Sequence, residues 1–412
     1  MAIDTEAKYG AAKYSVGGVL FDQPFKIRRL GHFGINAYRM SDALRFYNDL
    51  LGFRITDVRP MAGKTPEAFK DFGDTNGYFF RYGGDHHAFV LYNHRLRKAT
   101  DRTGFHKDDV MVNQITWQVG SLAEVVEGDA WFKRTGQKVV RSGRDMPGSN
   151  WHSYLMDPDL HKNEIYYGME QVGWDGRSKP WDMHDREFDH AAELPQISEY
   201  EEVNQAMARG SDFVSGFRDK ETLPLKYDVQ GILLARPFKI VKHGPVNLFV
   251  DNIDRAVDWY QRTLGFIVTE ETRCEGERCV FLRNNTEHHS LALFPVALRQ
   301  KLALRADTTM AAFGVQLGSY QQLLNAIDFL KAHGVEFREL PPEMTPGMDH
   351  TICALDPDGH AIQLYWSMEQ IGWDGKPRPA ASRRKIIPGQ WPKALEANAD
   401  SYAGEPFLGP LG

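Results

Sequence analysis

Alternating hydrophobic and polar positions begin a pattern that recurs along the chain. In HFGINAY (residues 32–38) apolar side chains occupy every second position, as in a strand with one buried face. ALRFYNDLLG (43–52) instead repeats its apolar residues at helical spacing and ends on Gly52, a residue typical of helix C-termini. FRITD, GYFFRYGG and HAFVLYN follow as short strand patterns. This segment therefore predicts a strand, a helix and three further strands.

The same order of elements is predicted three more times. Residues 112–140 again read as strand, helix and strand, and SNWHSYLMDPD and KNEIYYG complete that unit with two strands joined by a turn. Residues 244–266 and 311–337 repeat the strand and helix patterns in the second half of the chain. The patterning therefore predicts an α+β fold of four βαβββ modules in two pairs.

Internal repeats define the organisation of the chain. GVLFDQPFKIRRLG (18–31) returns as GILLARPFKIVKHG (231–244), and HKNEIYYGMEQVGWDG (161–176) returns as HAIQLYWSMEQIGWDG (360–375). The spacing between the copies is 213 positions at the start and 199 at the end. We therefore predict module pairs at 18–176 and 231–375. A linker with some helix would occupy 177–230, and a C-terminal extension 376–412.

Composition and charge narrow the classes of function. A chain of 412 residues with a net charge of −6 has no basic stripe with interleaved aromatics, which argues against a nucleic-acid partner. No apolar run is long enough for a membrane span, and the N-terminus has no apolar signal core, so a cytoplasmic location is expected. The three cysteines are too few for a disulfide framework. Because edge strands of such modules often pair with another copy, we expect a homo-oligomer.

Three stretches carry a resemblance to a known family. HFGINAYRMSDALRFYNDLLGF, NQITWQVGSL and YLMDPDLHKNEIYYG resemble the vicinal oxygen chelate superfamily of glyoxalases, bleomycin-resistance proteins and extradiol dioxygenases. Four modules with HH-x-(F/L)-x-L stretches are most similar to type I extradiol ring-cleaving dioxygenases. The resemblance implies that each module pair forms a cup-shaped mixed sheet, with two His and one Glu around Fe(II) in the active cup.

The resemblance assigns candidate site residues in the first pair. Its metal-ligand positions are His32, Gln114 and Glu164, and Gln114 stands where the family usually has His. Its acid–base histidine is His86, or His87 if the register shifts, although strand alternation would place His87 on the other face. Its active-site tyrosine is Tyr154, and by alternation His152 shares the face of Tyr154.

The second pair lacks this ligand set. The positions that correspond to the three predicted ligands hold Pro245, Ala312 and Gln363, so we expect a second cup without metal.

The resemblance implies an enzyme that cleaves a catecholic or hydroquinone-like aromatic ring with O2 and Fe(II). A second hypothesis is a metal-dependent isomerase, lyase or hydrolase of the glyoxalase type. Gln114 favours this hypothesis because an amide oxygen also suits Mn, Zn or Ni. A third is a non-enzymatic protein that binds a small aromatic molecule, because the second cup has lost its ligands.

Overall fold

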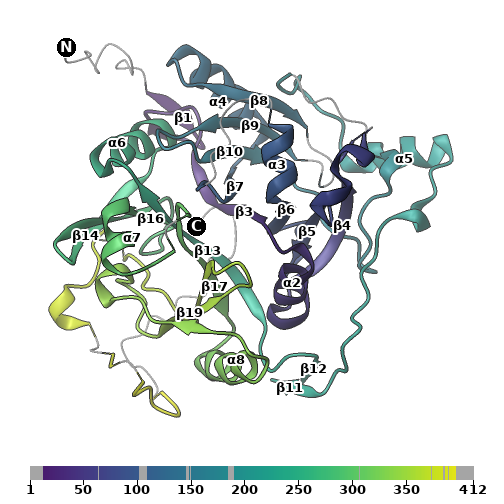
Figure 1. Cartoon of the computed structure of the whole chain (residues 1–412). Coiled ribbons are helices and arrows are strands. Elements are labelled where there is room, and N and C mark those ends of the chain that lie inside the picture. The colour runs from purple at the N-terminus through teal and green to yellow at the C-terminus, as the bar shows by residue number, and fades with distance from the viewer. Residues whose placement is uncertain are drawn as a thin grey trace.

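The computed structural model describes residues 13–395 apart from 64, 102–108, 145–147, 149, 184–189, 306, 373, 384–385 and 388. Residues 396–412 of the predicted C-terminal extension therefore lie outside the described part of the chain. The described residues form two eight-stranded sheets that lie side by side, each from one half of the chain (Figure 1). No helix among the described residues is long and apolar enough to cross a membrane.

The first sheet has the order β4-β5-β6-β3-β7-β10-β9-β8. Its strands are β3 (Ile27–Ala37), β4 (Arg54–Pro60), β5 (Asn76–Arg81), β6 (Phe89–Asn93), β7 (Val112–Val119), β8 (Val139–Arg144), β9 (Trp151–Met156) and β10 (Lys162–Tyr167). β3 pairs in parallel with β6 and β7 in parallel with β10, whereas the central pair of β3 and β7 is antiparallel. Two βαβββ modules thus join along β3 and β7.

The second sheet repeats this order as β14-β15-β16-β13-β17-β20-β19-β18. Its strands are β13 (Ile240–Val250), β14 (Ile267–Cys274), β15 (Glu277–Arg283), β16 (Leu291–Pro295), β17 (Met310–Leu317), β18 (Phe337–Arg338), β19 (Thr351–Leu355) and β20 (Ala361–Tyr365). A two-stranded hairpin precedes each sheet, β1 (Tyr14–Val16) with β2 (Val19–Phe21) and β11 (Tyr227–Val229) with β12 (Ile232–Leu234). The prediction of four βαβββ modules in two pairs is confirmed.

The helices begin and end where local sequence satisfies their backbone groups. Helix α4 starts after Ser121, whose hydroxyl accepts a hydrogen bond from the backbone N–H of Glu124. Helix α2 continues as the wider π-helical turn η1, which ends at Gly52 with a φ of 89°, a conformation that favours glycine. The α-helices are α2 (Met40–Leu44), α3 (His94–Thr100), α4 (Leu122–Arg134), α5 (Glu199–Arg209), α6 (Ile253–Leu264), α7 (Val296–Lys301) and α8 (Tyr320–Ala332).

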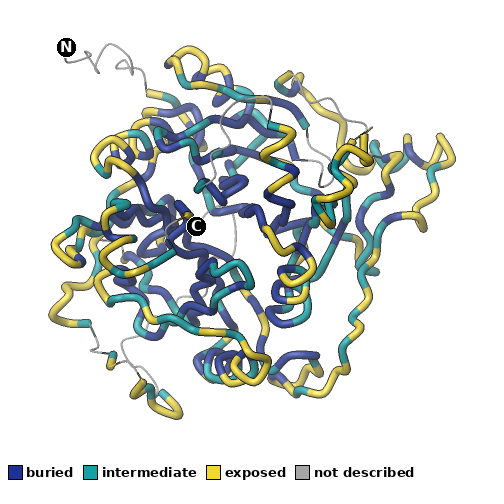
Figure 2. The backbone as a smooth tube through the Cα atoms, in the orientation of Figure 1, coloured by how far each residue is buried: buried dark blue, intermediate teal, exposed yellow. Residues whose placement is uncertain are grey.

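Short helical turns occupy the connections, and α5 lies in the segment between the two sheets. The turns are η1 (Arg45–Leu51), η2 (Pro66–Phe72), η3 (Trp181–Met183), η4 (Phe213–Ser215), η5 (Pro342–Met344) and η6 (Ala380–Ser382). Figure 2 shows that buried residues follow the strands of both sheets, whereas α5 and the loops around it are largely exposed.

One hydrophobic core extends across both halves. Phe33 of β3 stacks on Phe313 of β17, with ring centroids 4.4 Å apart and an interplanar angle of 18°. Both rings are fully buried. Burial of apolar area of this extent is the main favourable term in folding, so the two halves stabilise each other.

Two reciprocal hydrogen bonds reinforce this junction. Tyr47 of the first half donates to Asp356 in a turn of the second half, with an O–O distance of 2.9 Å. Tyr260 of the second half donates to Asp157 in the matching turn of the first half, also at 2.9 Å. Burial, together with the neighbouring carboxylates, raises the pKa of both phenols, so they stay protonated and can donate.

Candidate metal centre and its cavity

Three neighbouring strands bring the predicted ligands together. His32 lies in β3, Gln114 in β7 and Glu164 in β10, and β7 stands between the other two strands. In register, Thr116 of β7 pairs with both His32 and Glu164, and Gln114 lies two residues away on the same face. The side chains of His32 and Glu164 are 1% and 0% exposed.

His32 lies from each of the other two candidate ligands at a separation that a shared metal ion would require. Nε2 of His32 lies 2.8 Å from the amide nitrogen of Gln114 and 3.3 Å from Oε2 of Glu164. Ligand atoms at about 2.0–2.2 Å from one divalent ion, at right angles to each other, lie about 3 Å apart. A glutamine side chain can present either its nitrogen or its oxygen at this position. The three residues therefore fit a divalent metal.

Two further side chains fix the orientation of the Glu164 carboxylate. Thr116 donates to Oε2 at 2.7 Å, and Asn150 donates to Oε1 at 2.9 Å. Such outer hydrogen bonds hold a metal ligand in one orientation. Among the described residues, no group of three His, Cys, Asp or Glu side chains could hold a metal, and the third member of this candidate set is an amide.

A cavity of about 310 Å³ lies beside these donors. It is lined by His32, Arg59, Met61, Phe79, His87, Tyr92, Arg97, Asn113, Gln114, Val140, Arg141, Asn150, Tyr154 and Lys162. The cavity combines aromatic walls with a few convergent polar groups, which is typical of a small-molecule site.

The structure places His87, and not His86, on the wall of this cavity. Residues 82–88 form bends and an isolated bridge, and β6 begins only at Phe89, so strand alternation does not apply to the two histidines. The expectation that His87 faces away from the site is therefore wrong. The repeated tandem histidines were the available signal, but the sequence does not show which ring enters the cavity.

His86 connects His87 to a buried carboxylate. Nδ1 of His86 lies 3.0 Å from Nδ1 of His87, and Nε2 of His86 lies 2.8 Å from Oδ2 of Asp57. Burial, with the nearby imidazoles of His32 and His86, lowers the pKa of His87 well below its usual value. If both rings are neutral and the carboxylate accepts from His86, then His87 donates through Nδ1 and keeps Nε2 as an acceptor.

Tyr154 and His152 are close to each other but differ in their relation to the cavity. Tyr154 of β9 lines the cavity, is 3% exposed and pairs in register with Glu164. The ring of His152 lies 4.7 Å from the ring of Tyr154, and His152 is buried. His152 is not among the described residues that line the cavity, and its ring meets the ring of Tyr154 edge-on.

The second cup lacks the predicted ligand atoms. Ala312 and Gln363 stand at the positions of Gln114 and Glu164, and Gln363 accepts a hydrogen bond from Asn247 at 2.9 Å. Ala312 packs in an apolar cluster with Cys353 and Ala361. This half also has a cavity, of about 400 Å³, and its lining includes Glu270, Thr272, Leu340 and Thr351. The sheet and a cavity are thus retained while the ligand atoms are not.

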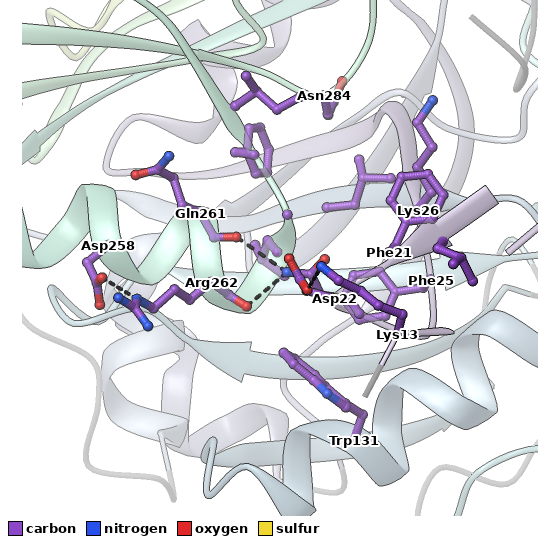
Figure 3. Close-up of a pocket in the computed structure, with 17 residues that line it drawn as sticks. Lys13, Phe21, Asp22, Phe25, Lys26, Trp131, Asp258, Gln261, Arg262 and Asn284 are labelled. Atoms are coloured by element: carbon purple, nitrogen blue, oxygen red, sulfur yellow. Dashed lines mark hydrogen bonds and ion pairs between the residues drawn. The ribbon is translucent and has the colours of Figure 1, made fainter. Parts of the chain in front are cut away.

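A larger cavity lies away from the predicted ligands, where the β1–β2 hairpin meets α6. Its volume is about 980 Å³, and Figure 3 shows its lining residues. Gln23 donates to the backbone oxygen of Arg262 at 3.0 Å, and Asp22 and Asp258 form ion pairs with Lys13 and Arg262. Its described lining contains no His or Cys, so the smaller cavity is the better candidate for chemistry.

The fold and the donor set define a class of protein in which paired βαβββ modules form a cup around a metal-binding position. A family model of the Glyoxalase/Bleomycin resistance protein/Dioxygenase superfamily matches residues 29–165 and 242–364. The chain belongs to this superfamily, and the resemblance inferred from the sequence is confirmed.

The similar proteins include dioxygenases and a glyoxalase. Metapyrocatechase 2 of Cupriavidus necator is 28% identical over 152 residues, which span 36% of this chain and 40% of that enzyme. The 2,3-dioxygenase LapB of Pseudomonas sp. KL28 shares the fold with a TM-score of 0.54, 16% identity and coverage of 85% and 96% of the two chains. The Mn(II)-bound glyoxalase of Novosphingobium aromaticivorans has a TM-score of 0.53, 15% identity and 85% coverage of each chain.

Proposed function

We propose that the first cup is the active site of a metal-dependent dioxygenase that cleaves a catecholic or hydroquinone-like aromatic ring with O2. In this proposal residues 18–176 form the reactive pair of modules and residues 231–375 a supporting pair. The convergence of His32, Gln114 and Glu164 beside an open cavity carries the proposal. The names of LapB and Metapyrocatechase 2 support the reaction class.

In the proposed reaction, His32, Gln114 and Glu164 hold the metal. Fe(II) held there would supply a Lewis-acidic centre for a diol and O2. Glu164 contributes negative charge in a fully buried position, and Thr116 and Asn150 keep its two oxygens oriented. Tyr154 lines the cavity, and in this proposal it would donate a hydrogen bond to an oxygen of the substrate.

We assign proton transfer to the two tandem histidines, His86 and His87. His87 lines the cavity and, in its neutral form, accepts the proton of a substrate hydroxyl at Nε2. His86, the residue expected from the sequence, stands behind it, and its hydrogen bond to Asp57 fixes which nitrogen of His87 is free to accept. The proposed roles are therefore acceptor for His87 and positioning residue for His86.

One observation favours a second function. Gln114 is a neutral amide where a His would complete a two-His, one-carboxylate set, and a set with one His also suits Mn, Zn or Ni. A metal-dependent isomerase, lyase or hydrolase of the glyoxalase type would need the same cavity without O2. The Mn(II)-bound glyoxalase with this fold is consistent with that alternative.

Oxygen consumption separates the two functions. We would purify the protein without oxygen, measure its metal content, supply Fe(II), and record O2 uptake and product absorbance with a panel of catechols. The proposal predicts stoichiometric iron and O2 uptake coupled to a coloured ring-cleavage product. Absence of O2 uptake with every diol, together with turnover of a glyoxalase-type substrate with Mn, would support the alternative. Gel filtration in the same preparation tests the proposed homo-oligomer.

A further inference from the structure

The larger cavity, between the β1–β2 hairpin and helix α6, has aromatic and apolar walls. Phe25, Trp131 and Phe266 line it, and the rings of Phe25 and Trp131 meet edge-on with centroids 6.0 Å apart. Leu20 and Ile267 also line it and are 65% and 51% exposed, although both are apolar. A cavity of about 980 Å³ with such walls can take a ligand larger than a single ring.

One polar side chain of this cavity is buried but only partly hydrogen-bonded. Asn284, which follows β15, lines the cavity and is 8% exposed. Its Oδ1 accepts a hydrogen bond from the hydroxyl of Ser290 at 3.0 Å, whereas its Nδ2 has no hydrogen-bond partner among the described residues. A buried donor without a partner is costly, so an acceptor oxygen from a ligand would satisfy this amide.

The cavity also has a cation whose charge is incompletely compensated. Lys26, just before β3, is half-buried, and its ammonium forms no hydrogen bond or ion pair with another described residue. Burial and the guanidinium of Arg28 lower the pKa of Lys26, and the carboxylate of Glu124 offsets this only in part. In the view of Figure 3, Lys26 and Asn284 lie toward the side of the cavity opposite Trp131. A cation and an unpaired donor are therefore available to an anionic group.

At the matching place of the other half, two arginines bind the linker between the halves. Arg236 occupies the repeat position of Gln23 and forms an ion pair at 2.5 Å with the linker segment 219–221. Arg54 occupies the repeat position of Ile267 and forms an ion pair at 3.7 Å with the same segment. Because Gln23 and Ile267 carry no charge, these two ion pairs have no counterpart at the cavity.

We propose that this cavity is a second ligand site, apart from the metal-binding cup, and that it binds an anionic molecule with an aromatic body through Lys26 and Asn284. The aromatic walls would cover the body of the ligand, while the ammonium and the amide N–H would bind its carboxylate. A hydrogen bond between two charged groups is stronger than one between neutral groups, so a neutral analogue should bind less tightly. The proposal does not depend on the reaction in the first cup.

Calorimetric titration of the full chain with 2-naphthoate and with its neutral analogue 2-naphthamide tests the site. We expect one-to-one binding of 2-naphthoate, about tenfold or more tighter than that of the amide. Lys26→Met should weaken the binding of 2-naphthoate at least about tenfold and remove the preference for the acid. Lys239→Met is the matched control, because Lys239 is the exposed repeat counterpart of Lys26 and should leave both affinities unchanged.

A further variant separates this site from the metal-binding cup. Arg97→Gln changes a cation of the smaller cavity and should leave the binding of 2-naphthoate unchanged. Equal affinity for the acid and the amide would overturn the proposal, as would the absence of binding at millimolar 2-naphthoate. An affinity that depends on Arg97 and not on Lys26 would also overturn it, because the anion would then bind in the first cup. Circular dichroism checks that each variant is folded.

Discussion

The Oε2 atom of Glu164 and the Nε2 atom of His32 lie 3.3 Å apart, and both side chains are almost fully buried. In the second half of the chain the same two positions hold Gln363 and Pro245. A buried carboxylate facing an imidazole is costly unless a cation or hydrogen bonds compensate it. Thr116 and Asn150 compensate the Glu164 carboxylate by hydrogen bonds. Because the matching positions of the second half hold no such pair, we propose metal chemistry for the first half.

Thr116→Val removes the hydroxyl that orients Oε2 of Glu164 while keeping the shape of the side chain. We expect the affinity for Fe(II) to fall about 10–100-fold, as for other outer partners of metal ligands. Competition with a chelator measures that affinity. Thr100→Val on α3, outside the cavity, serves as the control. Equal affinity of Thr116→Val and the unchanged protein would show that this hydroxyl does not support a metal ligand.

Gln114→His would create the two-His, one-carboxylate set that non-haem Fe(II) enzymes use. Since an imidazole is a better ligand for Fe(II) than an amide, we expect tighter Fe(II) binding, by about tenfold or more, in the same chelator competition. Thermal unfolding of the metal-free variant checks that the strand β7 still packs. A folded variant that binds Fe(II) less tightly than the natural chain would contradict direct ligation at this position.

The two tyrosines at the junction should contribute equally to stability. Tyr47→Phe and Tyr260→Phe each remove a hydrogen bond to a buried Asp, which we expect to lower the free energy of unfolding by about 1.5–3 kcal/mol. Urea unfolding measures the change, and Tyr200→Phe on the exposed face of α5 should change it by less than about 0.5 kcal/mol. A loss in only one of the two variants would contradict the symmetry of the junction.

The ion pair between Glu270 and Arg383 should hold the segment after the second cup in place until the pH becomes strongly acidic. Partial burial alone would raise the pKa of Glu270, but hydrogen bonds from His288 and Arg383 outweigh it and lower the pKa to about 2. The folded value lies below the unfolded value of about 4.3, so the contribution to stability is complete above pH 4.3 and is lost as pH falls toward 2.

A double-mutant cycle tests this pH dependence. We expect Glu270→Gln and Arg383→Gln to show a coupling energy of about 1 kcal/mol at pH 7 that declines between about pH 4 and 2. A coupling energy that already disappears by pH 5 would contradict the lowered pKa. Glu201→Gln with Arg383→Gln, two residues on separate elements, should show no coupling at either pH.

Much of the fold was predictable because its determinants are local. The strand and helix periodicities, the helix end at Gly52 and the repeated segments all lie within short stretches of sequence. The contacts across the junction were not predictable in this way. Tyr47 and Asp356 are 309 positions apart, and nothing near either residue indicates the other.

The candidate site was likewise predictable only in part. His32, Gln114 and Glu164 were assigned through family resemblance, and the strands bring them together. His87 was assigned to the wrong face because a loop replaces the strand at residues 82–88. The cations of the cavity could not be recognised from the sequence, since Arg59, Arg97 and Lys162 come from distant segments and look like ordinary surface charges.

The central claim is that the first cup holds a divalent metal through Glu164. The most direct test is the metal content of protein purified without oxygen and loaded with Fe(II), for the natural chain, Glu164→Gln and the surface control Glu201→Gln. We predict near-stoichiometric iron in the natural chain and the control, and loss of nearly all iron in Glu164→Gln, with all three folded by circular dichroism. Full iron content and O2 uptake in Glu164→Gln would contradict the account.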